Sequence, residues 1–210
     1  MEYKRNQIEE AIARTINSHS AVLSSELRTR VKRLLDTDRN LGRSKRSMDP
    51  TMANYAFYSS DSPGKGVEVW FSDYEAFALL TGLRLLQHGW PQSFAVEVLR
   101  RHRPELERQH DRILKQAPEE LFDEERIRKG ARPGDLYFDN ADPVFLTIAS
   151  GRRDEKDGAS GAVCHGMKQV AKFLKEVSAK SWTLLELVTP AHALHRELSK
   201  AEPRKRGRSG

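Results

Sequence analysis

The chain has 210 residues, of which 38% are hydrophobic and 31% are charged, and its formal net charge is +6. This length suits one large or two small domains of a soluble globular protein. No apolar run approaches the roughly 20 residues of a membrane-spanning helix, and the N-terminus is no signal peptide, so we expect a cytoplasmic protein without membrane association. The single Cys164 excludes an internal disulfide and a multi-cysteine metal site.

The positive charge is concentrated in two segments. Residues 28–46 hold eight Arg or Lys side chains against two Asp, and residues 199–210 hold five against one Glu, whereas the remainder of the chain is net acidic. A polyanionic partner is the simplest reason for such clustering. The alternative is a solvated helix face together with a solubilising tail.

The spacing of apolar residues predicts two helices near the start of the chain, over residues 4–16 and 25–41. In the second helix, Leu and Val side chains share one arc and cationic side chains share the adjoining arc. One side can therefore pack while the other presents cations and a hydroxyl, as a helix in a major groove requires. The outward side carries Arg28, Thr29, Lys32 and Arg39.

A basic segment follows Gly42, where the second helix is expected to end. Its cations suit the backbone of a duplex, and a plain exposed linker is the alternative. Residues 55–58 and 67–71 have the pattern of strands and are expected to pair as a β-hairpin. The turn-rich tip of that hairpin carries Lys65.

A capped helix is predicted directly after the hairpin. Ser72 opens a capping box with Glu75, in which each side chain bonds the backbone amide of the other residue. The helix that follows is leucine-rich around most of its circumference, so we expect it to be buried, with Gly89 at its end. A second, short helix is predicted over residues 92–99.

Five features occur in succession from the end of the second hairpin strand: an aromatic residue with a serine, an acidic helix start, a leucine-rich helix, a glycine and a short helix. They are Trp70-Phe71-Ser72, Asp73 with Glu75, Leu79 to Leu86, Gly89, and Gln92 to Leu99. This order resembles the DNA-binding domain of the MerR family of transcription regulators, and the helix over 25–41 is similar to that family's recognition helix. The resemblance covers residues 4–116 and implies a winged helix-turn-helix that binds DNA as a dimer.

We therefore expect an α+β protein with a mainly helical, winged helix-turn-helix N-terminal domain and a small α/β C-terminal domain. The boundaries are 1–116 for the first domain, 117–134 for a linker with one short helix, 135–198 for the second domain and 199–210 for a basic tail. The elements expected after residue 99 are helices over 104–116, 167–177 and 191–198, strands over 136–138, 144–149 and 182–188, and a polar loop over 151–161. The dimerising helix of the MerR family would span only about three turns at 104–116, so the dimer contact is expected in the C-terminal half.

No residue pattern indicates catalysis. Cys164 and His165 are adjacent, but neighbouring residues point in different directions and the scattered histidines lack a zinc spacing. His192 and His195 can share a helix face, yet they lack a third ligand. The nucleotide-binding and nucleophile-elbow motifs are absent. We expect no enzyme activity, cofactor or metal.

These observations predict a sequence-specific DNA-binding transcription regulator that reads a palindromic site as a homodimer. Arg28, Thr29, Lys32 and Arg33 would enter the major groove, Lys65 would contact the duplex from the hairpin wing, and the backbone would be held by Arg39, Arg43, Lys45 and Arg46. The C-terminal domain would dimerise, or bind a small molecule or a protein. The alternative is a protein-interaction adaptor that uses the winged helix as a scaffold and the C-terminal domain as its main contact surface.

Overall fold

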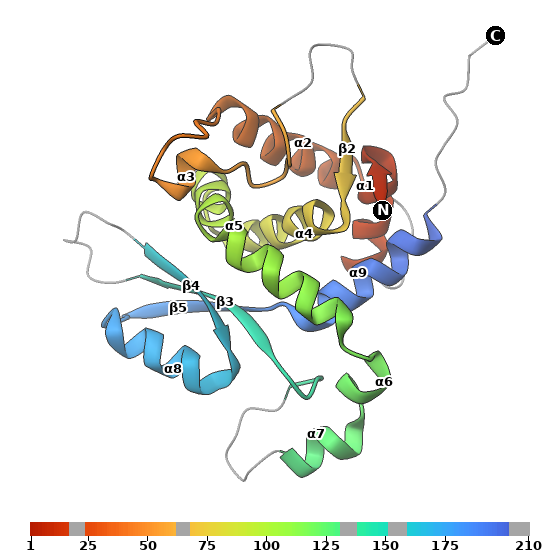
Figure 1. Ribbon diagram of the computed structural model, residues 1–210, viewed down its shortest axis with the longest axis vertical. Helices are drawn as coiled ribbons and strands as arrows, with labels where there is room; N and C mark the ends of the chain where they lie inside the picture. Colours follow the sequence, from red (N-terminus) through yellow and green to blue (C-terminus); the bar gives the residue numbers. More distant parts are fainter. Residues whose placement is uncertain (17–23, 62–67, 131–137, 151–158, 202–210) are drawn as a thin grey trace. The chain divides into compact units, whose positions relative to one another are not determined.

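The computed structural model describes residues 1–16, 24–61, 68–130, 138–150 and 159–201 of an α+β protein that is mainly helical (Figure 1). Its contacts divide the chain into two compact units. Unit 1 comprises Met1–Arg103 and Ala193–Gly210, and unit 2 comprises Pro104–His192. This division differs from the boundaries drawn from the sequence, because the end of the last helix belongs to unit 1.

Unit 1 is built from helices and one two-stranded sheet. Its elements are β1 (Glu2–Lys4), α1 (Arg5–Ile16), α2 (Ser25–Asn40), α3 (Pro50–Ala53), β2 (Trp70–Ser72) and α4 (Asp73–Gln87), with the first part of α5 (Gln92–Lys115) and the last part of α9 (Val188–Lys200). The predicted helices over 4–16 and 25–41 are confirmed within one residue at each end.

Helix α4 begins with the predicted capping box and is buried around most of its circumference. The Ser72 hydroxyl accepts a hydrogen bond from the Glu75 amide at 3.2 Å, and the Glu75 carboxylate accepts one from the Ser72 amide at 2.8 Å. Gly89 follows the helix with φ +84°, a backbone conformation that L side chains rarely adopt. Both ends of α4 therefore follow from local sequence.

Gly82 brings α2, α4 and α5 close together. A Cβ atom at this position would lie 3.3 Å from Cδ1 of Leu34 on α2 and 3.3 Å from Cδ1 of Leu99 on α5. Both leucines are fully buried. The absence of a side chain at Gly82 therefore sets how tightly α2 packs on the core of unit 1.

The predicted hairpin over residues 55–71 is wrong in its described part. Residues 55–58 form no strand, and β2 pairs antiparallel with the N-terminal strand β1 instead. Tyr3 lies opposite Phe71 in this pairing, and both side chains are buried, so β1 occupies the edge of β2 that the hairpin was expected to fill. The tip of the expected hairpin, with Lys65, lies outside the described residues.

Residues 55–58 are buried in an irregular conformation that charged side chains hold in place. The Asp38 carboxylate accepts hydrogen bonds from two consecutive amides of this segment, at 3.0 Å from Ala56 and 2.9 Å from Phe57. Arg103 donates to two of its carbonyl oxygens at 2.8 and 2.7 Å. Side chains thus satisfy four backbone groups of this buried segment without a neighbouring strand.

Helix α5 is one continuous helix, whereas the sequence predicts separate helices over 92–99 and 104–116. Pro104 lies inside it and cannot donate a hydrogen bond to the carbonyl of Arg100. That carbonyl instead accepts a hydrogen bond from the Asn54 side-chain amide at 3.4 Å. A contact from a distant residue therefore compensates for the proline.

Unit 2 contains a three-stranded antiparallel sheet in the order β4-β3-β5. Helix α8 covers one face of it (Figure 1). Phe145, Cys164 and Val170 form a buried cluster between the helix and the sheet. The elements of unit 2 are the end of α5, α6 (Pro118–Leu121), α7 (Glu124–Gly130), β3 (Val144–Ser150), β4 (Ala159–His165), α8 (Gly166–Glu176), β5 (Ser181–Glu186) and the start of α9.

Three expectations for this half of the chain are corrected. The single helix expected in the 117–134 segment is two short helices, α6 and α7. The polar loop expected over 151–161 ends earlier, because β4 already begins at Ala159. Phe138 is not in a strand, and the rest of the strand expected over 136–138 lies outside the described residues. The strands expected over 144–149 and 182–188, and the helices over 167–177 and 191–198, are present with shifted ends.

Among the described residues, no helix combines the length and the apolar character that crossing a membrane requires.

Candidate nucleic-acid interface on helix α2

Helix α2 has a well-defined start and one buried face. Ser24 caps its N-terminus by accepting a hydrogen bond from the Leu27 amide at 3.1 Å. The side chains of Val31, Leu34 and Leu35 are buried. Packing of this face leaves the opposite side of the helix exposed to solvent, as its amphipathic sequence predicts.

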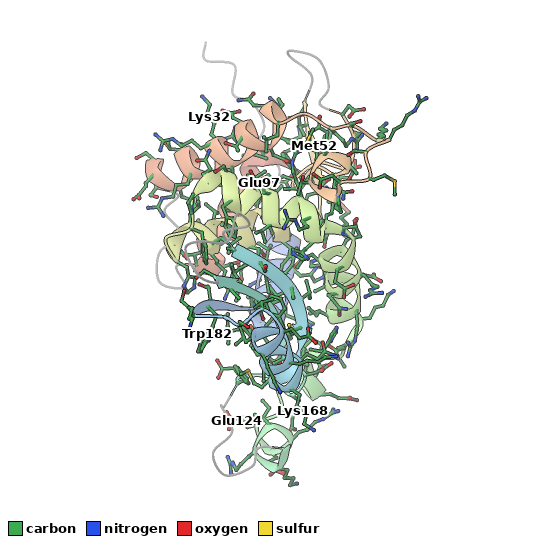
Figure 2. All side chains as sticks on the ribbon, turned by 90° about the vertical axis from the view of Figure 1, so that its left-hand side faces the viewer. Lys32, Met52, Glu97, Glu124, Lys168 and Trp182 are labelled. Carbon is green, nitrogen blue, oxygen red and sulfur yellow. The ribbon has the colours of Figure 1, made fainter. Side chains whose placement is uncertain are left out.

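The exposed side of α2 carries the four side chains expected to enter a major groove. Arg28, Thr29, Lys32 and Arg33 are all exposed, and Figure 2 shows Lys32 on the outward side of the helix. Within the described part of the chain, none of these three cations has a carboxylate within ion-pair distance. Arg30 on the same helix differs, since it binds Glu26 at 2.6 Å. The free cations are therefore available to a polyanion.

Polar contacts with α5 fix the position of α2. Arg100 donates to the carboxylate of Asp38 at 2.6 Å and to the carbonyl oxygen of Gly42 at 2.8 Å. The side-chain amide of Gln92 donates to the carbonyl oxygen of Arg33 at 3.2 Å, and it also donates to the Thr37 hydroxyl. These contacts tie both the middle and the end of α2 to α5, so its outward side chains project from a rigid support.

The cations that follow on α2 and the next loop have partners within the chain. Arg39 donates to the Tyr58 hydroxyl at 3.3 Å and lies over its ring. Arg43 binds the Asp61 carboxylate at 2.9 Å, and Lys45 approaches the other oxygen of the same carboxylate at 3.4 Å. These three cations therefore already have partners within the chain, whereas the described residues supply no carboxylate to Arg28, Lys32 and Arg33 on α2.

The remaining two predicted site residues are Arg46 and Lys65. Arg46 is exposed in the loop between α2 and α3. Lys65 lies outside the described residues. The structure thus brings the residues expected in the major groove together on one side of α2. Among the residues expected to contact the DNA backbone, Arg46 is exposed, whereas Arg39, Arg43 and Lys45 contact other side chains of unit 1.

Two ionisable groups beside α2 are perturbed. Burial raises the pKa of Tyr58 to about 12, and the nearby carboxylates of Asp38 and Asp36 act in the same direction against Arg39. Burial acts to raise the pKa of Asp61, but the hydrogen bond and charge of Arg43, with Lys45, outweigh it and hold that pKa below its usual value. Tyr58 is thus neutral and Asp61 charged near neutral pH.

Sequence reasoning missed the residues that support the interface: Asp38, Tyr58, Asp61 and Arg100. Only Asp38 gives a local signal, because it lies on the apolar arc of the helix, next to Leu34 and Leu35, where a carboxylate requires a buried partner. The other three are recognisable only once the fold is known.

The Cys and His side chains considered for chemistry each have their own local contacts. Cys164 is buried, and that burial raises the pKa of its thiol. In unit 2, His192 lies 3.1 Å from the carbonyl oxygen of Ile113, and in unit 1 His195 lies 2.9 Å from a carboxylate oxygen of Asp73. No group of three or more His, Cys, Asp or Glu side chains within the described ranges is arranged to hold a metal ion.

The chain matches no protein-family model, and no curated protein shows significant sequence similarity to it.

Proposed function

We propose that this protein is a sequence-specific DNA-binding transcription regulator that inserts α2 into a major groove. The observation that carries the proposal is the group of exposed cations on α2, which have no carboxylate partner among the described residues: Arg28, Lys32 and Arg33. Cations left unpaired on a rigid helix favour a partner that supplies negative charge, and duplex DNA does so at regular spacing.

The contacts around α2 also favour recognition of a DNA sequence over nonspecific electrostatic binding to DNA. The helix is anchored at Asp38 by a buried ion pair and by the Gln92 side chain near its middle. A side chain can discriminate between base edges only if its backbone is held in place. The anchoring therefore suits sequence recognition, which a mobile basic segment would not provide.

The proposal keeps part of the resemblance to the MerR family. It retains a recognition helix, α2, that follows α1 and packs on α4, as in a helix-turn-helix. It omits the hairpin wing, because residues 55–58 form no strand. A homodimer belongs to the proposal because one helix reads too few base pairs for selectivity. The dimer contact, or a small-molecule or protein partner, is assigned to unit 2.

The test is a random-pool duplex selection with the purified 210-residue chain, followed by binding measurements over a range of salt concentrations. We expect a palindromic site, a steep fall of affinity with salt, and a salt slope smaller by about 1 after Lys32→Ala. Lys168→Ala is the matched control, because Lys168 is also exposed but lies on α8 in unit 2.

Two results would contradict the proposal. One is a selection that enriches no sequence together with binding that is insensitive to salt, as expected of an adaptor that binds other proteins. The other is an equal loss of affinity in the Lys32→Ala and Lys168→Ala variants, since this would place the contact outside α2.

A further inference from the structure

A carboxylate lies in the middle of the cationic face of α2. Asp36 is partly exposed, and no hydrogen bond or ion pair to it is found within the described part of the chain. Lys32 and Asn40 lie one turn away on either side of it, as do Arg33 and Arg39. An unpaired carboxylate on this face repels the phosphate groups that its neighbours attract.

Asp36 also lies close to the central line of the outward side of the helix. At about 100° per residue, Thr29, Asp36 and Asn40 fall within roughly 40° of one another and point away from the buried side chains of Val31 and Leu34. The long cations lie on the two flanks of this line, Lys32 on one side and Arg33 on the other. In a groove, the central line faces the base edges and the flanks face the two phosphate backbones.

The chemistry of a central carboxylate restricts what it can contact. An ionised Asp only accepts hydrogen bonds, so it must meet a donor. In the major groove the donors are the N4 amino group of cytosine and the N6 amino group of adenine, and Asp or Glu contacts the former. Adenine also presents the N7 acceptor beside its amino group, which repels a carboxylate.

We infer that Asp36 is a specificity-determining residue that accepts a hydrogen bond from a cytosine amino group in the DNA site. This inference rests on the proposed function and adds to it one base and one residue. The repulsion between Asp36 and phosphate lowers the affinity for DNA in general. The hydrogen bond to cytosine is made only at the correct sequence, so the carboxylate increases discrimination.

The experiment is the same duplex selection, performed side by side with the unaltered protein and with Asp36→Asn, Asp36→Ala and Asp111→Asn. Asn both donates and accepts, and it pairs with the N6 and N7 atoms of adenine. We expect Asp36→Asn to change one selected position in each half-site from cytosine to adenine, by roughly tenfold in relative affinity. Asp36→Ala should lose preference at that position only. Asp111→Asn removes the same charge from α5 in unit 2 and should leave the selected site unchanged.

The outcomes separate this inference from the proposed function. Suppose that the unaltered protein selects a site and both Asp36 variants select the same one. Asp36 then only reduces the positive charge of α2, and the inference fails while the proposed function stands. A uniform gain of affinity for all sequences in Asp36→Asn leads to the same conclusion. If the unaltered protein selects no site, the proposed function is contradicted, and the inference about Asp36 falls with it because it rests on that function. Unchanged circular dichroism and urea midpoints of the variants establish that the comparison is between folded proteins.

Discussion

The carboxylate of Asp38 on α2 accepts a hydrogen bond from Nε of Arg100 on α5 at 2.6 Å, and both side chains are fully buried. Arg100 also donates to the backbone oxygens of Asp38, Gly42 and Thr51, and Asp38 accepts from the amides of residues 56 and 57. One ion pair therefore joins α2, α5 and two irregular segments of unit 1. Its charges are offset by hydrogen bonds on nearly every side, which a buried pair requires.

Replacing Asp38 by Ala should lower the free energy of unfolding by about 3 to 5 kcal/mol, because the Arg100 guanidinium would be left buried without a counter-charge. Urea denaturation followed by tryptophan fluorescence measures this loss. Arg108→Ala, which removes an exposed partner of Glu105, should cost less than about 1 kcal/mol. A loss for Asp38→Ala no larger than that of the control would show that the pair does not support the fold.

Ser72→Ala should destabilise the protein by about 1 kcal/mol, because the Glu75 amide loses its hydrogen-bond acceptor at the first turn of α4. Hydrogen exchange should become faster at the first amides of α4 before it changes elsewhere. Ser199→Ala near the end of α9 is the control, and we expect it to change stability by less than about 0.5 kcal/mol. Unchanged exchange in α4 would contradict a role for the capping box.

Gly82→Val should destabilise unit 1 by about 1 to 3 kcal/mol. The new side chain would extend beyond a Cβ position that already lies 3.3 Å from Leu34 and from Leu99, so the core would be overpacked. The urea midpoint measures the effect. Gly130→Val is the matched control at the end of α7, where a Cβ would meet nothing within 4 Å. Equal urea midpoints for the two variants would contradict close packing of α2 on α4 at Gly82.

Tyr58 should ionise late in an alkaline titration. Burial raises its pKa to about 12 from 10.0, so the neutral phenol is favoured in the folded state. Its contribution to stability is present below about pH 10 and is lost as the pH rises from there towards 12. In phenolate absorbance, the difference between the unaltered protein and Tyr58→Phe should be a transition near pH 12. A difference centred near pH 10, with circular dichroism still native, would contradict the buried phenol.

Helix positions in this chain follow from local sequence, whereas strand partners do not. The capping box at Ser72 and the apolar spacing of α2 determine both helices within a few residues. The strand-like pattern of residues 55–58 identifies a buried segment but not its hydrogen-bond partners, which are side chains at Asp38 and Arg103. Pairing between distant parts of the chain depends on tertiary structure that alternation alone does not encode.

The candidate site divides in the same way. Amphipathic spacing correctly predicts that Arg28, Lys32 and Arg39 lie on the exposed side of α2, with Thr29 beside them. It does not predict that Arg43 and Lys45 share the carboxylate of Asp61, because that contact closes a loop between residues 16 to 18 positions apart. The exposure of a side chain can be inferred from the helical repeat. Whether its charge is neutralised depends on which distant segment packs beside it in the folded chain.

The last helix makes unit 1 discontinuous along the chain. Beyond His192, α9 is tied to the N-terminal region by His195 with Asp73, by Glu197 with Arg14 and by a hydrogen bond from Gln7 to the carbonyl of residue 201. A fragment that stops at Arg103 would therefore lack buried side chains of its own core, those of Leu194 and Leu198. The ribosome makes the end of α9 after residues 1–103 and after all of unit 2, so the nascent chain cannot complete unit 1 until α9 has emerged.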